Sequence, residues 1–123
     1  MKILFYDTKS YDREFFEKLL PSYPGIEIKF IEANIHEETA ALAHGYDAIC
    51  AFVNADLGAP VIEELHRQGV KLILMRCAGY NNVDLETTAK CVIQVARVPG
   101  YSPEAVAEHA MALALTANRH THK

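Results

Sequence analysis

The sequence predicts an α/β domain built on a five-stranded parallel sheet with helices on both faces. Three observations lead to this prediction. Short apolar runs of strand length recur along the chain, amphipathic segments of helical length separate them, and glycine or proline marks many of the boundaries. Regular alternation of strands and helices is typical of parallel sheets, which need a crossover between consecutive strands. The length of 123 residues suits one domain.

Five apolar runs are interpreted as strands. They cover residues 2–7, 26–33, 47–53, 71–77 and 92–98. The run DAICAFV (47–53) is apolar after its aspartate, as expected for a strand that is buried on both faces. The run IEIKFIEA (26–33) instead alternates, which predicts a half-exposed strand at the edge of the sheet. Its apolar face carries Ile26, Ile28 and Phe30.

Five further segments are interpreted as helices. They cover residues 11–20, 36–45, 60–69, 84–91 and the segment from 102 onward. Pro60 and Gly69 are typical of the two ends of a helix, and Gly45 is expected to stop the second helix. Asp84 is expected to cap the fourth helix. Five strands alternating with helices in this length suit a flavodoxin-like three-layer domain with strand order 2-1-3-4-5.

The last helix is apolar over almost its whole circumference. Ser102 can cap it, Pro103 suits its first position, and Glu104 lies near the positive end of the helix dipole. Alanine, valine, methionine and leucine then dominate residues 105–115. Such a helix is expected to be covered on more than one side. His109 lies among these apolar residues and is interpreted as a core histidine rather than a base.

The composition favours a packed cytoplasmic domain. Half of the residues are hydrophobic and 23% are charged. A net charge of −4 argues against a nucleic-acid partner, and no apolar run reaches the length of a membrane span. Cys50, Cys77 and Cys91 are widely spaced and form no CxxC motif, so we interpret them as reduced thiols. We assign no residue to a metal.

Candidate site residues are expected where the strands end, because ligands bind beyond the carboxyl ends of an open parallel sheet. The most informative stretch is RCAGYNNVD (76–84). Gly79 allows the backbone to approach a ligand, and successive amides in such a loop can form a nest for a carboxylate. The same spacing also describes a tight turn with local hydrogen bonds. On spacing alone, the turn is the favoured interpretation.

Polar residues at the other strand ends are ambiguous. The hydroxyl of Tyr101 can bind a ligand, or its ring can simply cover the edge of the core. Asn54 is more typical of a turn, and Asp7 of a cap in a strand–helix connection, than of a ligand-binding residue. No GxGxxG, P-loop or GxSxG motif occurs. Spacing therefore assigns no pair of base and nucleophile.

Two segments carry a resemblance to a known family. RCAGYNNVDL and RVPGYSPEAVAEHAMAL resemble motifs of the D-isomer-specific 2-hydroxyacid dehydrogenases, most closely of their D-lactate dehydrogenase branch. The opening KILFYDTKSYDREFF and the segment CAFVNADL are similar to the same branch. The resemblance implies that residues 1–100 are the N-terminal part of a substrate-binding (catalytic) domain. Residues 101–123 would form a long crossing helix that leads to an NAD-binding Rossmann domain absent from this chain.

The resemblance also implies a site for a small 2-oxo or 2-hydroxy carboxylic acid. Ala78 and Gly79 match the loop whose backbone amides hold the substrate carboxylate. Cys77 matches the position just before that loop, at the edge of the site. Asn54 is a weaker match to a substrate-binding position.

The resemblance implies that two residues of this chain contact the cofactor NAD. Tyr101 matches a tyrosine that lines both the substrate and the nicotinamide site, and Val106 matches an aliphatic residue against the nicotinamide. The family's catalytic arginine, glutamate and histidine would all lie beyond Lys123, as would its glycine-rich dinucleotide motif. The chain alone is therefore expected to be inactive, the complete enzyme is expected to be a homodimer, and a GxGxxG motif is expected downstream.

Two alternatives of other classes remain open. One is a receiver domain of a response regulator, which shares the length, the acidity and the strand pattern. That family needs an acidic cluster after strand one, an aspartate ending strand three and Lys-Pro after strand five. At the three corresponding places, this chain has a single aspartate (Asp7), then Asn54, and then Arg97-Val98-Pro99. The other alternative is a free-standing module that binds a small carboxylate without chemistry.

Overall fold

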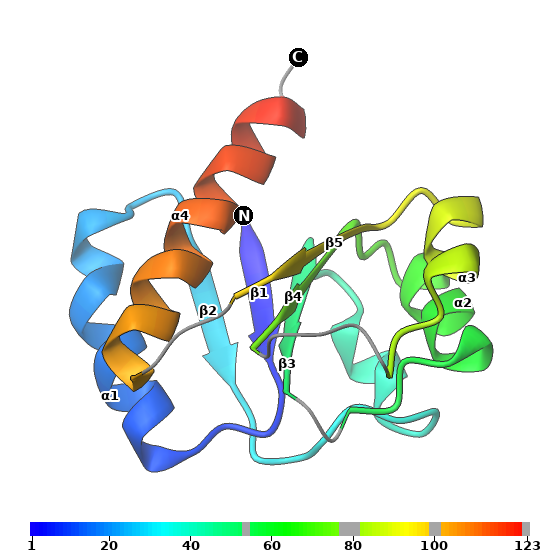
Figure 1. The fold of residues 1–123 in the computed structure, drawn as a ribbon, viewed down its shortest axis with the longest axis horizontal. Coiled ribbons are helices and arrows are strands. Elements are labelled where there is room, and N and C mark those ends of the chain that lie inside the picture. Colours follow the sequence, from blue (N-terminus) through cyan, green and yellow to red (C-terminus); the bar gives the residue numbers. More distant parts are fainter. Residues whose placement is uncertain (53–54, 77–81, 99–101, 122–123) are drawn as a thin grey trace.

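A single parallel sheet organises the chain, in a computed structural model that describes residues 1–52, 55–76, 82–98 and 102–121. Its five strands lie in the order β2-β1-β3-β4-β5 (Figure 1). Their bounds are β1 (Lys2–Phe5), β2 (Glu27–Phe30), β3 (Ala48–Ala51), β4 (Leu72–Met75) and β5 (Gln94–Arg97). The strand order expected from the sequence is confirmed, and β2 is an edge strand as its alternating pattern predicts.

Helices cover both faces of this sheet. The α-helices are α1 (Ser10–Leu19), α2 (Ala59–Arg67), α3 (Leu85–Lys90) and α4 (Pro103–Thr121), and the short 3-10 helices are η1 (Leu20–Ser22) and η2 (Ala40–Ala43). Helices α1 and α4 lie side by side on one face, whereas α2, α3 and η2 cover the other (Figure 1). This arrangement is the three-layer fold that the element order predicts.

Alternating side chains of the strands fill two separate cores. Because successive residues of a strand point to opposite faces, Ile3 and Phe5 pack beneath α1 and α4, while Leu4 packs beneath α2 and η2. The central strands β3 and β4 are buried along their whole length. Their continuously apolar sequences follow from this burial on both faces.

Two predicted caps are present. The carboxylate of Asp84 accepts a hydrogen bond from the backbone N–H of Thr87 at 3.1 Å, at the start of α3. The hydroxyl of Ser102 accepts one from the N–H of Ala105 at 3.2 Å, at the start of α4. Both side chains satisfy a backbone donor that the first turn of a helix leaves without a partner.

The segment 36–45 departs from its prediction as an α-helix. Only Ala40–Ala43 are helical, and they form the 3-10 helix η2. Side chains compete for the preceding backbone: the N–H of His36 donates to the Thr39 hydroxyl at 3.0 Å, and that hydroxyl donates to the carbonyl of Asn34 at 2.6 Å. Such local bonds offer the backbone an alternative to the α-helical pattern. Gly45 does end the element, with φ of +85°.

Helix α4 is covered along one face within the described chain. Ala107, Ala110, Met111 and Ala114 are buried against α1 and the sheet. Their spacing of three and four residues defines one helical stripe. The expectation of a core histidine is wrong, because His109 lies outside this stripe and is exposed. The C-terminal turns of α4 project beyond the sheet (Figure 1).

Candidate functional site

The carboxyl edge of the sheet is where parallel strands place ligand-binding residues. At this edge, β3, β4 and β5 lead into segments 53–54, 77–81 and 99–101, which are not among the described residues. The sequence-predicted site residues in these segments are Asn54, Cys77, Ala78, Gly79 and Tyr101. The described part of the edge consists of the connection from β1 to α1 and the residues that flank these segments.

Asp7 turns the chain sharply after β1. It adopts a left-handed backbone conformation with φ of +52°, which aspartate tolerates better than most residues. Its N–H donates to the carbonyl of Ala33 at 2.8 Å, and its carboxylate pairs with the ammonium of Lys9 at 2.9 Å. That hydrogen bond raises the pKa of Lys9. Asp7 is therefore a turn residue in an ion pair rather than the cap that the sequence favours.

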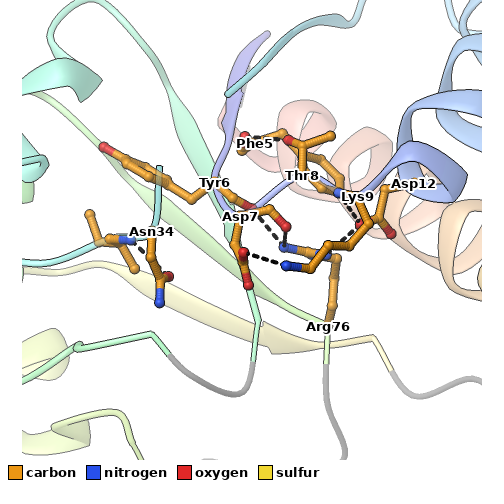
Figure 2. Close-up of polar contacts among 9 residues, drawn as sticks. Phe5, Tyr6, Asp7, Thr8, Lys9, Asp12, Asn34 and Arg76 are labelled. Carbon is orange, nitrogen blue, oxygen red and sulfur yellow. Dashed lines mark hydrogen bonds and ion pairs between the residues drawn. The ribbon is translucent and has the colours of Figure 1, made fainter. Parts of the chain in front are cut away.

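Arg76 lies at this edge, directly after β4. Its guanidinium pairs with the carboxylate of Asp12 at 3.0 Å, and both side chains are almost completely buried, with exposed fractions of 3% and 5%. A second guanidinium nitrogen donates to the carbonyl of Tyr6 at 2.7 Å. Figure 2 shows the guanidinium reaching from β4 to the connection between β1 and α1.

Asp12 has a second role at the start of α1. The carboxylate oxygen that pairs with Arg76 also accepts a hydrogen bond from the backbone N–H of Lys9 at 3.0 Å. Lys9 precedes the first residue of the helix, so this bond satisfies a donor at the helix N-terminus. The negative charge also lies at the end of the helix where the dipole stabilises it. A single carboxylate thus fixes both α1 and Arg76.

Apolar and aromatic groups surround the Arg76 guanidinium. Its centre lies 4.3 Å from the ring centroid of Phe5 and 5.1 Å from that of Phe52. Its Nε atom is buried and has no partner in hydrogen-bond geometry. The thiol of Cys50 is close enough for Arg76 to influence its pKa, although burial dominates and raises that pKa to about 11. A thiol of this kind is protonated and unreactive at neutral pH.

The far side of segment 77–81 is also held by described contacts. The side-chain amide of Asn82 donates to the carbonyl of Ala55 at 2.8 Å. Leu57 and Val83 form an isolated parallel bridge, and the N–H of Asp84 donates to the carbonyl of Leu57 at 2.9 Å. The chain after β4 is therefore attached to the chain after β3.

The described residues do not form a dinucleotide site by themselves. Val106, the one predicted cofactor contact among them, is partly buried against the core under α1 and α4. The sequence has no glycine-rich strand–helix turn that would cradle a pyrophosphate. The described residues thus fit NAD only as a neighbouring surface.

Two other kinds of site are not found in the described ranges. Residues 1–52, 55–76, 82–98 and 102–121 contain no group of three or more His, Cys, Asp or Glu side chains placed to hold a metal ion. Over the same residues, no helix combines the length and the apolar character needed to cross a bilayer.

Sequence reasoning missed the pair of Arg76 and Asp12. The one local signal is an arginine directly after the apolar run of β4, where a buried strand end would rarely accept an unpaired charge. Its partner is 64 positions away in the sequence, and Asp12 reads as one acidic residue among several on an amphipathic helix. Only the tertiary structure brings the two together.

Comparisons with known proteins find similarity along the whole chain. The family model described as "D-isomer specific 2-hydroxyacid dehydrogenase, catalytic domain" matches residues 3–121. D-lactate dehydrogenase of Escherichia coli (strain K12) is 46% identical over 123 residues, which are 100% of this chain and 37% of that protein.

Solved structures show the same similarity. The apo-structure of D-lactate dehydrogenase from Escherichia coli has a TM-score of 0.78 and 47% identity, over 99% of this chain and 38% of that one. The NAD-complexed D-isomer-specific 2-hydroxyacid dehydrogenase of Lactobacillus delbrueckii ssp. bulgaricus has a TM-score of 0.74 and 28% identity, over 94% and 35%. This chain therefore spans little more than a third of these relatives, and it belongs to the D-isomer-specific 2-hydroxyacid dehydrogenases as part of their catalytic domain.

Proposed function

We propose that this chain is the N-terminal, substrate-binding part of an NAD-dependent D-2-hydroxyacid dehydrogenase that interconverts D-lactate and pyruvate. The observation that carries the proposal is the 46% identity to a D-lactate dehydrogenase along the complete chain. The similarity to an NAD-complexed relative supports NAD as the cofactor. The domain division proposed is residues 1–100 for the substrate-binding part and 101–123 for the helix that leads to the nucleotide-binding domain.

The proposed substrate site lies at the carboxyl edge of the sheet. Backbone amides of Ala78 and Gly79 would bind the substrate carboxylate, with Cys77 and Asn54 beside it. Tyr101 would line both the substrate and the nicotinamide, and Val106 would face the nicotinamide. Support comes from the family membership and from the positions of these residues in the sequence, in the connections that follow β3, β4 and β5 or at the start of α4.

This chain would hold and orient the substrate, whereas the chemistry needs groups supplied from outside it. NAD accepts or donates the hydride in this class of reaction. A carboxylate held by fixed backbone amides has little freedom to rotate, and such orientation lowers the barrier of a transfer between two bound molecules. The isolated 123 residues are accordingly proposed to be inactive.

The experiment compares the 123-residue chain with the protein expressed from the complete reading frame. Oxidation of NADH is followed by its absorbance with pyruvate as substrate. We expect turnover by the complete protein and none by the chain alone. Family-like turnover by the isolated chain would refute its inactivity. Absence of turnover by the complete protein with pyruvate and with bulkier 2-oxo acids would refute the proposed function.

The homodimer remains a prediction that light scattering of the complete protein would test.

A further inference from the structure

We propose that the outer face of helix α3, together with the exposed Val92 that follows it, is a two-fold contact surface on which a second copy of this chain docks. The inference rests on the proposed function only for the expectation that copies of the protein associate. It deepens that expectation, because it names a surface through which they meet.

Two exposed apolar side chains lie at the two ends of α3. Leu85, the first residue of the helix, is 48% exposed, and Val92, two residues after its end, is 84% exposed. Ala89 lies between them and is exposed as well. Contact with another protein would remove this apolar surface from water, and such removal is the main driving force of association.

The backbone presents the Val92 side chain to solvent in a strained conformation. Its φ of +56° lies in the left-handed region, which is unfavourable for a β-branched residue. Strain of this kind persists where contacts or function compensate for it. Because the side chain is largely exposed within the described chain, the compensation is expected from a contact with another molecule.

Two opposite charges lie beside these apolar side chains. Glu86 and Lys90 are one helical turn apart, and their side chains are 81% and 73% exposed. They form an ion pair at 3.6 Å within α3. An ion pair as exposed as this one contributes little to stability. Each charge can therefore exchange its partner for the opposite charge of another molecule at little cost.

The surface is complementary to itself in an antiparallel arrangement. A two-fold axis near the middle of α3 would place Leu85 against Val92 of the second copy. The same register would place Glu86 against Lys90 of the second copy, because both pairs are centred close to Thr88. A two-fold contact uses one patch twice, so each of these pairs would occur twice. Ala89, near the axis, is small enough to let the two helices approach closely.

A second copy fits this surface better than the remainder of the same polypeptide. Helix α4, which the proposed nucleotide-binding domain would follow, packs with α1 on one face of the sheet, whereas α3 packs with α2 on the other (Figure 1). The charges of Glu86 and Lys90 cancel, so the surface would not attract a strongly charged partner. Its one acid and one base instead match the same two groups in reverse order.

The first test is site-specific cross-linking of the complete protein, which reports on this surface even if other surfaces also hold copies together. Ala89→Cys places a thiol near the proposed axis, and Glu63→Cys, on the exposed face of α2, is the matched control. Both are made in a Cys91→Ser background, so that the native thiol does not compete. We expect mild oxidation to link the Ala89→Cys variant into dimers about tenfold faster than the control, because the two thiols are held together.

The second test exchanges the charges. Glu86→Lys and Lys90→Glu each bring like charges together, whereas the double variant restores opposite charges in reverse order. Sedimentation velocity of the complete protein at several concentrations measures association. We expect each single variant to weaken association about tenfold and the double variant to recover it. Arg67→Glu, which breaks an exposed ion pair with Glu64 on α2, should match the wild type.

Val92→Gly separates association from folding. It removes the exposed side chain and relieves the backbone strain, so we expect weaker association of a chain that is itself more stable. A residue with a purely structural role would change the stability of the chain and leave its association unchanged.

Equal cross-linking of the Ala89→Cys and Glu63→Cys variants would overturn the inference. Single charge variants that associate like the wild type would do the same, as would a double variant that fails to recover association. Reduction of pyruvate by the wild-type protein in these cases leaves the proposed function standing. A protein that associates through α3 but reduces no 2-oxo acid refutes the proposed function alone.

Discussion

Val92 is the clearest site of local backbone strain at the scale of single residues. Its φ of +56° lies in the left-handed region, which a β-branched side chain adopts at a cost, and its side chain is 84% exposed. Because the side chain is so exposed, its packing contacts offset little of this strain. Val92 lies between α3 and β5, at the sheet edge opposite the candidate site.

Replacing Val92 by glycine should stabilise the fold. Glycine adopts a positive φ without strain, so Val92→Gly is expected to raise the free energy of unfolding by about 1 kcal/mol despite the greater freedom of the unfolded chain. Urea unfolding followed by circular dichroism measures the change. Val92→Ala is the control, because it removes the branched side chain and keeps most of the strain. A glycine variant less stable than the wild type would contradict the account.

The two described cysteines should differ in reactivity. Cys50 is fully buried and its pKa is raised to about 11, so only about one thiol in a thousand is ionised near pH 8. Cys91 is partly exposed and free. We expect iodoacetamide to label Cys91 in the native protein and Cys50 only after unfolding in urea, as mapped by mass spectrometry. Rapid native labelling of Cys50 would show that this core opens readily.

Residues of the candidate site were predictable from the sequence to very different degrees. Gly79 and Tyr101 stand out through their motifs, although their spacing alone is also compatible with plain turns. Arg76 is invisible as an anchor because its partner lies on α1 and no local pattern links the two. Asp7 has the side chain of a cap, but the left-handed turn after β1 points its carboxylate to Lys9 instead.

At the scale of elements, the helix ends follow local chemistry closely. Gly69 ends α2 with φ of +94°, and a Cβ atom added there would meet no atom within 4 Å. A side chain at this position would therefore meet no clash, and only the positive φ disfavours residues other than glycine. The prediction for 60–69 succeeded because this glycine and Pro60 are direct physical signals of helix ends.

Substitution of this glycine should isolate the backbone cost. Gly69→Ala is expected to lower the free energy of unfolding by about 1 kcal/mol, because alanine is strained at a positive φ. Gly25→Ala is the matched control, since it meets equally open space without a positive φ. It should leave the stability unchanged or slightly higher. Equal effects of the two substitutions would argue against the strained turn at Gly69.

Helix α4 offers the corresponding test of packing. Met111, on α4, is fully buried against α1 and the sheet, whereas Leu115 is only partly buried. Met111→Ala should destabilise the fold by about 2–5 kcal/mol, and Leu115→Ala by clearly less, in the same urea titration. Similar losses for both would mean that α4 does not dock on α1 by the face described above.

At the scale of the whole molecule, the fold was the most predictable property. Continuous apolar runs such as those of β3 and β4 are typical of strands that helices cover on both faces, and alternation with helices leaves few topologies. The segment 36–45 shows the limit of this reasoning: its composition suits a helix, but hydrogen bonds of Thr39 and Asn34 redirect the backbone. Such local competition between side chain and backbone is not visible in the apolar pattern of a sequence.

The apolar circumference of α4 is the other property that only the complete molecule can explain. Within the described chain one stripe is buried, while Glu108, His109 and Ala112 are exposed. The proposed nucleotide-binding domain would follow this helix. Membership of the dehydrogenase family excludes the receiver domain as an alternative.

The stereochemistry of the product tests the central claim most directly. The complete protein is incubated with pyruvate and NADH, and the lactate formed is resolved by chiral chromatography. A domain that holds the carboxylate in one orientation beside the cofactor exposes a single face of the carbonyl, so one enantiomer alone is expected. The similarity to a D-lactate dehydrogenase predicts that this enantiomer is D-lactate. Formation of L-lactate, of a racemic mixture or of no lactate would contradict the account.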